Sequence, residues 1–128
     1  MEYVIQVDEN DNFQGIIEKI EAHKKGILHR AVSVLIFNSK GEMLLQKRAT
    51  NKYHSGGLWS NAACTHPSPD ETTEQASLRR LQEEMGLSAN LSYLYSFIYK
   101  VNLNNGMIEH EFDHVFVGVT DEKPTLNP

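Results

Sequence analysis

Four side chains that could do chemistry converge on one short stretch of the sequence, from Cys64 to Leu87. Cys64 and His66 directly precede a segment with the apolar spacing of a helix. Within that segment, Arg80 and Glu84 lie four residues apart and therefore share one helix face. Each residue alone is more often structural, as a packed thiol or a solvated ion pair. The convergence of a thiol, an imidazole, a cation and a carboxylate predicts a functional site.

A second group of residues has the chemistry of metal ligands. Glu109 and Glu111 alternate along a predicted strand, so both carboxylates point to one face, about 7 Å apart. Two like charges on a half-buried face repel each other unless a cation lies between them. With His23, His29 and His66 they form a nitrogen and oxygen donor set that suits Mn²⁺ or Zn²⁺. The alternative interpretation is a solvated strand face and unrelated surface histidines.

A helix should hold the first group in place. Ser68 is the predicted N-cap, Pro69 the first helical residue, and Glu71 the partner that closes a capping box. The helix should run to about Met85, with Gly86 as a left-handed terminator. One apolar stripe lies along it: Leu78, Leu81 and Met85.

The rest of the sequence predicts mainly strands. The expected strands are 3–7, 29–37, 43–47, 58–64, 93–103 and 108–120, and the apolar segment 16–22 could be a strand or a short helix. The β-branched strand 29–37 should be central. Turns are expected at 8–12, 38–41 and 104–106. The predicted fold class is α+β, a mixed sheet with one main helix, in a single domain of residues 1–128. No second long helix follows to cover the other sheet face.

From Thr65 onward the sequence resembles a Nudix box, whose usual pattern is G-x5-E-x7-R-E-U-x-E-E-x-G-U. The residues that fit are Glu71, Arg79, Leu81, Glu83, Glu84, Gly86 and Leu87. Thr65 replaces the first glycine, and Arg80 replaces the glutamate that follows the arginine. Because Arg80 removes a Mg²⁺ ligand and adds a repulsive charge, the pattern argues against a Nudix hydrolase. With Cys-x-His-Pro just upstream, it is similar to type I isopentenyl-diphosphate isomerase, the Nudix relative that isomerises its substrate.

This resemblance implies two metal sites. The family's transition-metal ligands match His23, His29, His66, Glu109 and Glu111, which would hold Mn²⁺ or Zn²⁺. Glu84 matches the residue that contacts a Mg²⁺ ion bound to the substrate diphosphate. His54, His110 and His114 match no functional position and are predicted to be structural.

The resemblance also implies the substrate and the reaction. The residues that match its diphosphate anchors are Lys19, Arg48, Lys52 and Arg80. Cys64 and Glu111 match the two groups that move protons on opposite faces of the substrate, and Tyr99 matches a tyrosine beside the carboxylate. The expected reaction converts isopentenyl to dimethylallyl diphosphate through a tertiary carbocation. The family also uses a tryptophan well beyond the position of Thr120, which this sequence lacks.

Composition limits the remaining possibilities. A net charge of −5 disfavours nucleic acid as the main partner, and no apolar run of membrane-spanning length is present. One cysteine and no signal-peptide pattern predict a cytoplasmic protein. The resemblance implies that its partner is a small-molecule diphosphate. Two alternatives stand beside the isomerase: a Nudix diphosphate hydrolase, and an inactive module that binds metal and diphosphate.

Overall fold

The computed structural model describes residues 2–44, 46–47, 59–60 and 62–124 of the 128-residue chain. Within these residues the elements are, in order, β1 (Tyr3–Val7), β2 (Phe13–Glu18), α1 (Lys19–Lys25), β3 (His29–Phe37), β4 (Gln46–Lys47), β5 (Trp59–Ser60), β6 (Ala63–Thr65), α2 (Thr73–Met85), β7 (Ser92–Asn102) and β8 (Ile108–Val119). The structure confirms the predicted α+β class. Neither helix has the length and apolar character that crossing a membrane would require.

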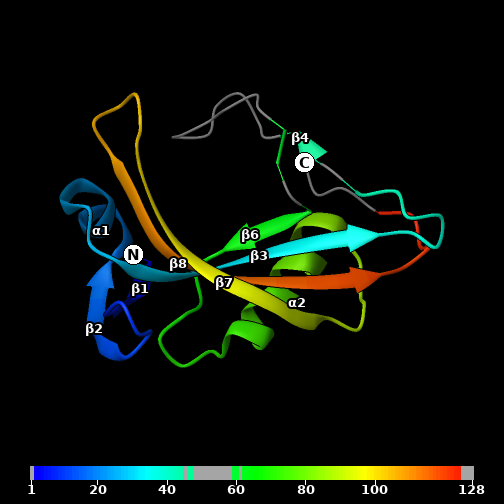
Figure 1. Ribbon diagram of the computed structural model, residues 1–128, viewed down its shortest axis with the longest axis horizontal. Coiled ribbons are helices and arrows are strands. Elements are labelled where there is room, and N and C mark those ends of the chain that lie inside the picture. The colour runs from blue at the N-terminus through cyan, green and yellow to red at the C-terminus, as the bar shows by residue number, and fades with distance from the viewer. Residues whose placement is uncertain (1, 45, 48–58, 61, 125–128) are drawn as a thin grey trace.

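The main sheet has the strand order β2-β1-β3-β8-β7, and β6 pairs with β3 beside this path (Figure 1). β3 and β8 are parallel, whereas the other pairs in this sheet are antiparallel. β4 and β5 form a separate two-stranded sheet. The sheet is therefore mixed, as predicted, and β3 is central because it pairs with three strands, β1, β6 and β8.

β3 is central because its β-branched residues fit a strand buried on both faces. Its parallel register with β8 runs from His29 opposite Glu111 to Phe37 opposite Val119. Side chains alternate between the two sheet faces. Val34 and Ile36 therefore point toward α2, where they form a buried cluster with Leu81. His29 and Ser33 point to the other face, on which the candidate site lies.

The main helix begins later than predicted. Thr72 is the N-cap, and it forms a capping box with Gln75, so α2 starts at Thr73. The segment from Ser68 to Glu71 is a turn, in which the Glu71 carboxylate accepts from the Ser68 backbone N–H at 3.0 Å. Two capping-box patterns follow one another here, Ser68 to Glu71 and Thr72 to Gln75, and α2 uses the second. The Glu71 carboxylate also forms an ion pair with Arg79.

The helix end and its buried stripe follow the sequence in part. Gly86 is the left-handed C-cap, as predicted, and its N–H donates to the carbonyl of Gln82. Leu81 and Met85 are buried against the sheet, but Leu78 is 40% exposed, so its place in the stripe was predicted wrongly. The buried face is completed by the small residues Ala76 and Ser77, which allow close approach to the sheet.

Several local predictions need adjustment. The segment predicted as strand or helix contains both, since β2 ends at Glu18 and α1 follows directly. The predicted return strand 43–47 is reduced to a bridge between Phe37 and Met43 and to β4, which pairs with β5. The single strand predicted over 58–64 is divided between β5 and β6, in different sheets. The long strands β7 and β8 and the strand β1 are confirmed.

The two faces of the main sheet are covered unequally. In Figure 1, α2 lies against one face, and α1 lies at the end of the sheet near β1 and β2. On the face opposite α2, the edge strand β7 presents Tyr95 and Phe97, which are 49% and 41% exposed. This face also carries the candidate site.

Candidate metal and proton-transfer site

Two histidines six residues apart are brought together by a tight reversal of the chain. His23 lies in the last turn of α1 and His29 is the first residue of β3. Gly26 caps α1 in the left-handed conformation at φ +69°, which glycine adopts without strain. The two imidazole rings consequently lie 5.1 Å apart between their centroids, and both side chains are fully buried.

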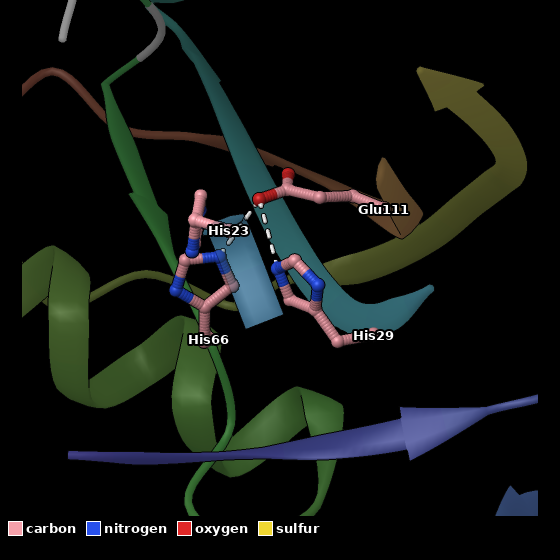
Figure 2. Close-up of side chains that lie close together, drawn as sticks. All are labelled: His23, His29, His66 and Glu111. Carbon is pink, nitrogen blue, oxygen red and sulfur yellow. Dashed lines mark hydrogen bonds and ion pairs between the residues drawn. The ribbon is translucent and has the colours of Figure 1, made fainter. Parts of the chain in front are cut away.

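His66 and Glu111 complete the group from two other strands. His66 directly follows β6, and its ring centroid lies 4.9 Å from that of His29. Glu111 lies opposite His29 in the β3–β8 register. Figure 2 shows the Glu111 carboxylate directed between the two rings, with its Oε2 atom 2.8 Å from His66 Nε2 and 3.4 Å from His29 Nε2. One candidate ligand atom from each of the four residues, His23 included, lies within 4.8 Å of the others.

The outer contacts of these histidines fix the orientation that a metal site needs. The Nδ1 atoms of His23 and His29 lie 2.8 Å from the carbonyl oxygens of Lys19 and Ile27. Because a carbonyl only accepts, each Nδ1 must donate a hydrogen, which leaves the lone pair of each neutral ring on Nε2. Burial, as the largest effect, lowers the pKa of His23 and so favours its neutral form. The group is therefore able to bind a divalent metal ion.

Glu111 is ionised although it is only 6% exposed. Burial alone would raise its pKa, but the hydrogen bonds and positive charges that His29 and His66 supply when protonated outweigh that effect and hold the pKa of Glu111 well below its usual range. A buried carboxylate is stable when a positive charge lies next to it, either on a protonated imidazole or on a metal ion. This is the electrostatic setting expected of a carboxylate ligand.

Tyr99 links the two carboxylates of β8. Its hydroxyl lies 2.7 Å from Glu109 Oε1 and 2.5 Å from Glu111 Oε1, and it faces Glu111 across the β7–β8 pairing. Burial first, and then the charge of Glu111, raise its pKa, so the hydroxyl keeps its proton. The four residues His23, His29, His66 and Glu111 are called the metal group below. This group does not include Glu109, although the sequence predicted Glu109 as a fifth ligand.

Cys64 lies on the same face of the sheet as Glu111. β6 pairs with β3, which places Cys64 opposite Ser33, and Ser33 in turn lies opposite Val115 of β8. Since alternate residues share a face, the side chains of Cys64, Ser33 and Glu111 project from the same side of three neighbouring strands. Cys64 is exposed, whereas Glu111 is buried.

The predicted diphosphate residues are placed only in part. Arg80 and Glu84 share one face of α2, as predicted, and pair with each other. Lys19 is the first residue of α1, and its Nζ atom lies 3.4 Å from Glu2 Oε2. Arg48 and Lys52 lie outside the described residues.

The sequence did not single out two buried polar residues of this face. Ser33 Oγ donates to Asp113 Oδ2 at 2.7 Å, and both residues are more than nine-tenths buried. The signal for Ser33 is a lone hydroxyl within the otherwise apolar run of residues 31–37, and that for Asp113 is a third carboxylate that alternates with Glu109 and Glu111. Burial, as the largest effect, raises the pKa of Asp113 to about 6.

Comparison with known proteins first defines the class. The NUDIX domain model matches residues 27–128. Among solved structures, the DR0079 protein from Deinococcus radiodurans has a TM-score of 0.79 at 22% identity, covering 99% of this chain and 77% of that one. The MutT protein from Methanosarcina mazei has a TM-score of 0.68 at 24% identity, covering 78% of this chain and 70% of that one. At this identity the two structures establish the Nudix fold alone.

Curated relatives then identify the family. An isopentenyl-diphosphate Delta-isomerase of Pectobacterium atrosepticum is 58% identical over 98% of this chain and 70% of its own length. Isopentenyl-diphosphate Delta-isomerase 2 of Aromatoleum aromaticum is 53% identical over 98% of this chain and 66% of its own. The chain therefore belongs to the isopentenyl-diphosphate Delta-isomerases of the Nudix fold. It spans about two thirds of the length of these relatives, as the coverage shows.

Proposed function

We propose that the chain converts isopentenyl diphosphate to dimethylallyl diphosphate, a step that supplies isoprenoid precursors. Family membership supports this reaction. The observation that carries it is the common sheet face of Cys64 and Glu111, from strands on either side of β3. A thiol and a carboxylate on one face can act on a five-carbon group from two sides.

The chemistry requires one proton to be added and another removed. A proton joins the terminal carbon of the 3,4 double bond, a tertiary carbocation forms, and a proton leaves carbon 2. One of Cys64 and Glu111 delivers the first proton, and the other accepts the second. Tyr99, 2.5 Å from Glu111 Oε1, can pass a proton to or from that oxygen, and its ring can stabilise the cation.

The same proposal assigns the two kinds of metal. His23, His29, His66 and Glu111 would hold Mn²⁺ or Zn²⁺, with Glu109 as the predicted fifth ligand. When bound, that ion would supply positive charge beside Glu111. Glu84 would contact a Mg²⁺ ion carried by the diphosphate. The diphosphate, with roughly three negative charges, would be held by four side-chain cations: Lys19, Arg48, Lys52 and Arg80.

One assay separates this function from its two rivals. The chain is incubated with isopentenyl diphosphate, Mg²⁺ and Mn²⁺, and product is followed by proton NMR; a parallel sample receives nucleoside di- and triphosphates. Dimethylallyl diphosphate without phosphate release supports the isomerase. Phosphate release from the nucleotides would support a Nudix hydrolase instead. Binding of isopentenyl diphosphate without any product would support the inactive module.

A further inference from the structure

A second polar row crosses the sheet beside the metal group. The first row joins His66, His29 and Glu111, and the second joins Cys64, Ser33 and Asp113, one residue from each of β6, β3 and β8. In β6 and β8 the two rows are offset by two residues, so they share one sheet face.

The hydrogen bonds of this second row run from Cys64 to Ser33 and from Ser33 to Asp113. Ser33 Oγ donates its only proton to Asp113 Oδ2 at 2.7 Å. The oxygen of Ser33 is then left as an acceptor, and Cys64 Sγ lies 3.9 Å from it as donor. Ser33 is 7% exposed and Asp113 5%, so water does not compete freely for these contacts.

A buried hydroxyl and a buried carboxylate within a sheet are energetically costly unless hydrogen bonds satisfy them. Ser33 Oγ satisfies Asp113 Oδ2, whereas Asp113 Oδ1 is buried without a hydrogen-bond partner among the described residues. The contact between Cys64 and Ser33 is not required to satisfy the thiol, because Cys64 is exposed and solvent could satisfy it.

We propose that Ser33, held by Asp113, is a positioning residue that fixes the rotamer of Cys64 and so aims its sulfur at the substrate. This inference rests on the isomerase function proposed above. A short side chain on an exposed strand position otherwise samples several staggered rotamers. Proton transfer to or from a carbon requires the sulfur at one place, so an unfixed thiol lowers the rate of the chemical step.

The first test compares three variants by steady-state kinetics. Ser33→Ala removes the acceptor and should lower kcat about 10- to 100-fold with little change in KM. Ser33→Thr keeps the hydroxyl and should restore most of kcat. Val32→Ala, on the opposite face of β3, controls for lost packing and should leave kcat nearly unchanged. If Ser33→Ala keeps half or more of kcat, or if Ser33→Thr is as slow as Ser33→Ala, the proposal is wrong.

The second test does not depend on turnover. Cys64 is the only cysteine of the chain, so selective isotope labelling of cysteine reports its χ1 angle through three-bond couplings in NMR spectra. Wild type and Ser33→Thr should show one dominant rotamer, whereas Ser33→Ala and Asp113→Ala should show averaged couplings. One dominant rotamer in Ser33→Ala would overturn the positioning role, even if the wild-type chain turns over. A chain without turnover but with the predicted couplings would contradict the isomerase function alone.

Discussion

At the scale of single residues, Glu111 has contacts of two different kinds. Its Oε2 atom faces the imidazoles of His66 and His29, while its Oε1 atom accepts from Tyr99. Oε2 is thereby directed to the histidines of the metal group, and Oε1 to the Tyr99 hydroxyl, which can relay a proton. A single carboxylate can therefore be both ligand and proton handler without changing its rotamer.

The first prediction concerns the metal group. His66→Ala removes the imidazole nearest Glu111 and should weaken Zn²⁺ or Mn²⁺ binding about 10-fold or more, because a ligand is lost. Metal content after gel filtration of untagged, resupplied protein measures this. His114→Gln is the control, since His114 lies on the opposite sheet face and contacts Asp11. Equal metal content in wild type and His66→Ala, or no retained metal in wild type, would contradict the assignment.

At the scale of elements, the turn between α1 and β3 decides whether His23 and His29 can meet. Two features of the structure favour glycine at position 26. Its φ of +69° strains other residues, and an added Cβ would lie 3.2 Å from Ile108. Its carbonyl also accepts from His110 at 3.0 Å, which ties the turn to β8.

The second prediction follows from this turn. Gly26→Ala should lower the free energy of unfolding by about 1–2 kcal/mol and also weaken metal binding, because crowding against Ile108 moves the turn. Gly41→Ala is a matched control: Gly41 has φ +81°, and an added Cβ would meet nothing within 4 Å. Gly41→Ala should lower the free energy of unfolding without weakening metal binding. Unchanged metal affinity in Gly26→Ala would mean that the turn does not set the histidine geometry.

The third prediction concerns the segment that leads into α2. Arg79 holds Glu71 through contacts of 2.7 and 3.0 Å, and this hydrogen-bonded pair lowers the pKa of Glu71. A lowered pKa adds stability above the ordinary value of 4.5, and this stability is lost as the pH falls through the folded-state value. Glu71→Gln should therefore cost about 1 kcal/mol at pH 7, a modest amount because Arg79 is partly exposed.

Urea unfolding of wild type and Glu71→Gln at several pH values measures this effect. The difference should be constant from pH 7 to 5 and shrink below about pH 4.5. Glu83→Gln, which removes the more exposed partner of Arg79, should change stability less. A difference between wild type and Glu71→Gln that grows as the pH falls would contradict the assigned ion pair.

At the scale of the whole molecule, the fold does not determine the reaction. The MutT protein from Methanosarcina mazei shares this fold at 24% identity, while the isomerase relatives are 50–58% identical to this chain. Arg80 stands where the Nudix-box pattern has a glutamate, and it pairs with Glu84. The metal group instead comes from α1, β3, β8 and the residue after β6.

Local patterns in the sequence were sufficient for most elements. β3, β7 and β8 follow from β-branched and aromatic runs, and the ends of both helices from glycines. The parallel pairing of β3 with β8 was not predictable, because it joins segments about eighty residues apart. The same pairing brings His29 to Glu111 and Ser33 to Asp113. The resemblance therefore supplied the predicted metal ligands, whereas the Ser33–Asp113 contact required the structure.

The exchange of solvent deuterium into isopentenyl diphosphate is the sharpest test of the proposed reaction. In D₂O, wild type should place deuterium in the methyl group of the dimethylallyl product, because the added proton comes from a side chain that exchanges with solvent. Cys64→Ala and Glu111→Gln should each lower this incorporation about 10²- to 10⁴-fold while keeping a cooperative unfolding transition. Wild-type incorporation in either variant, or none in the wild-type chain, would contradict the pairing of thiol and carboxylate.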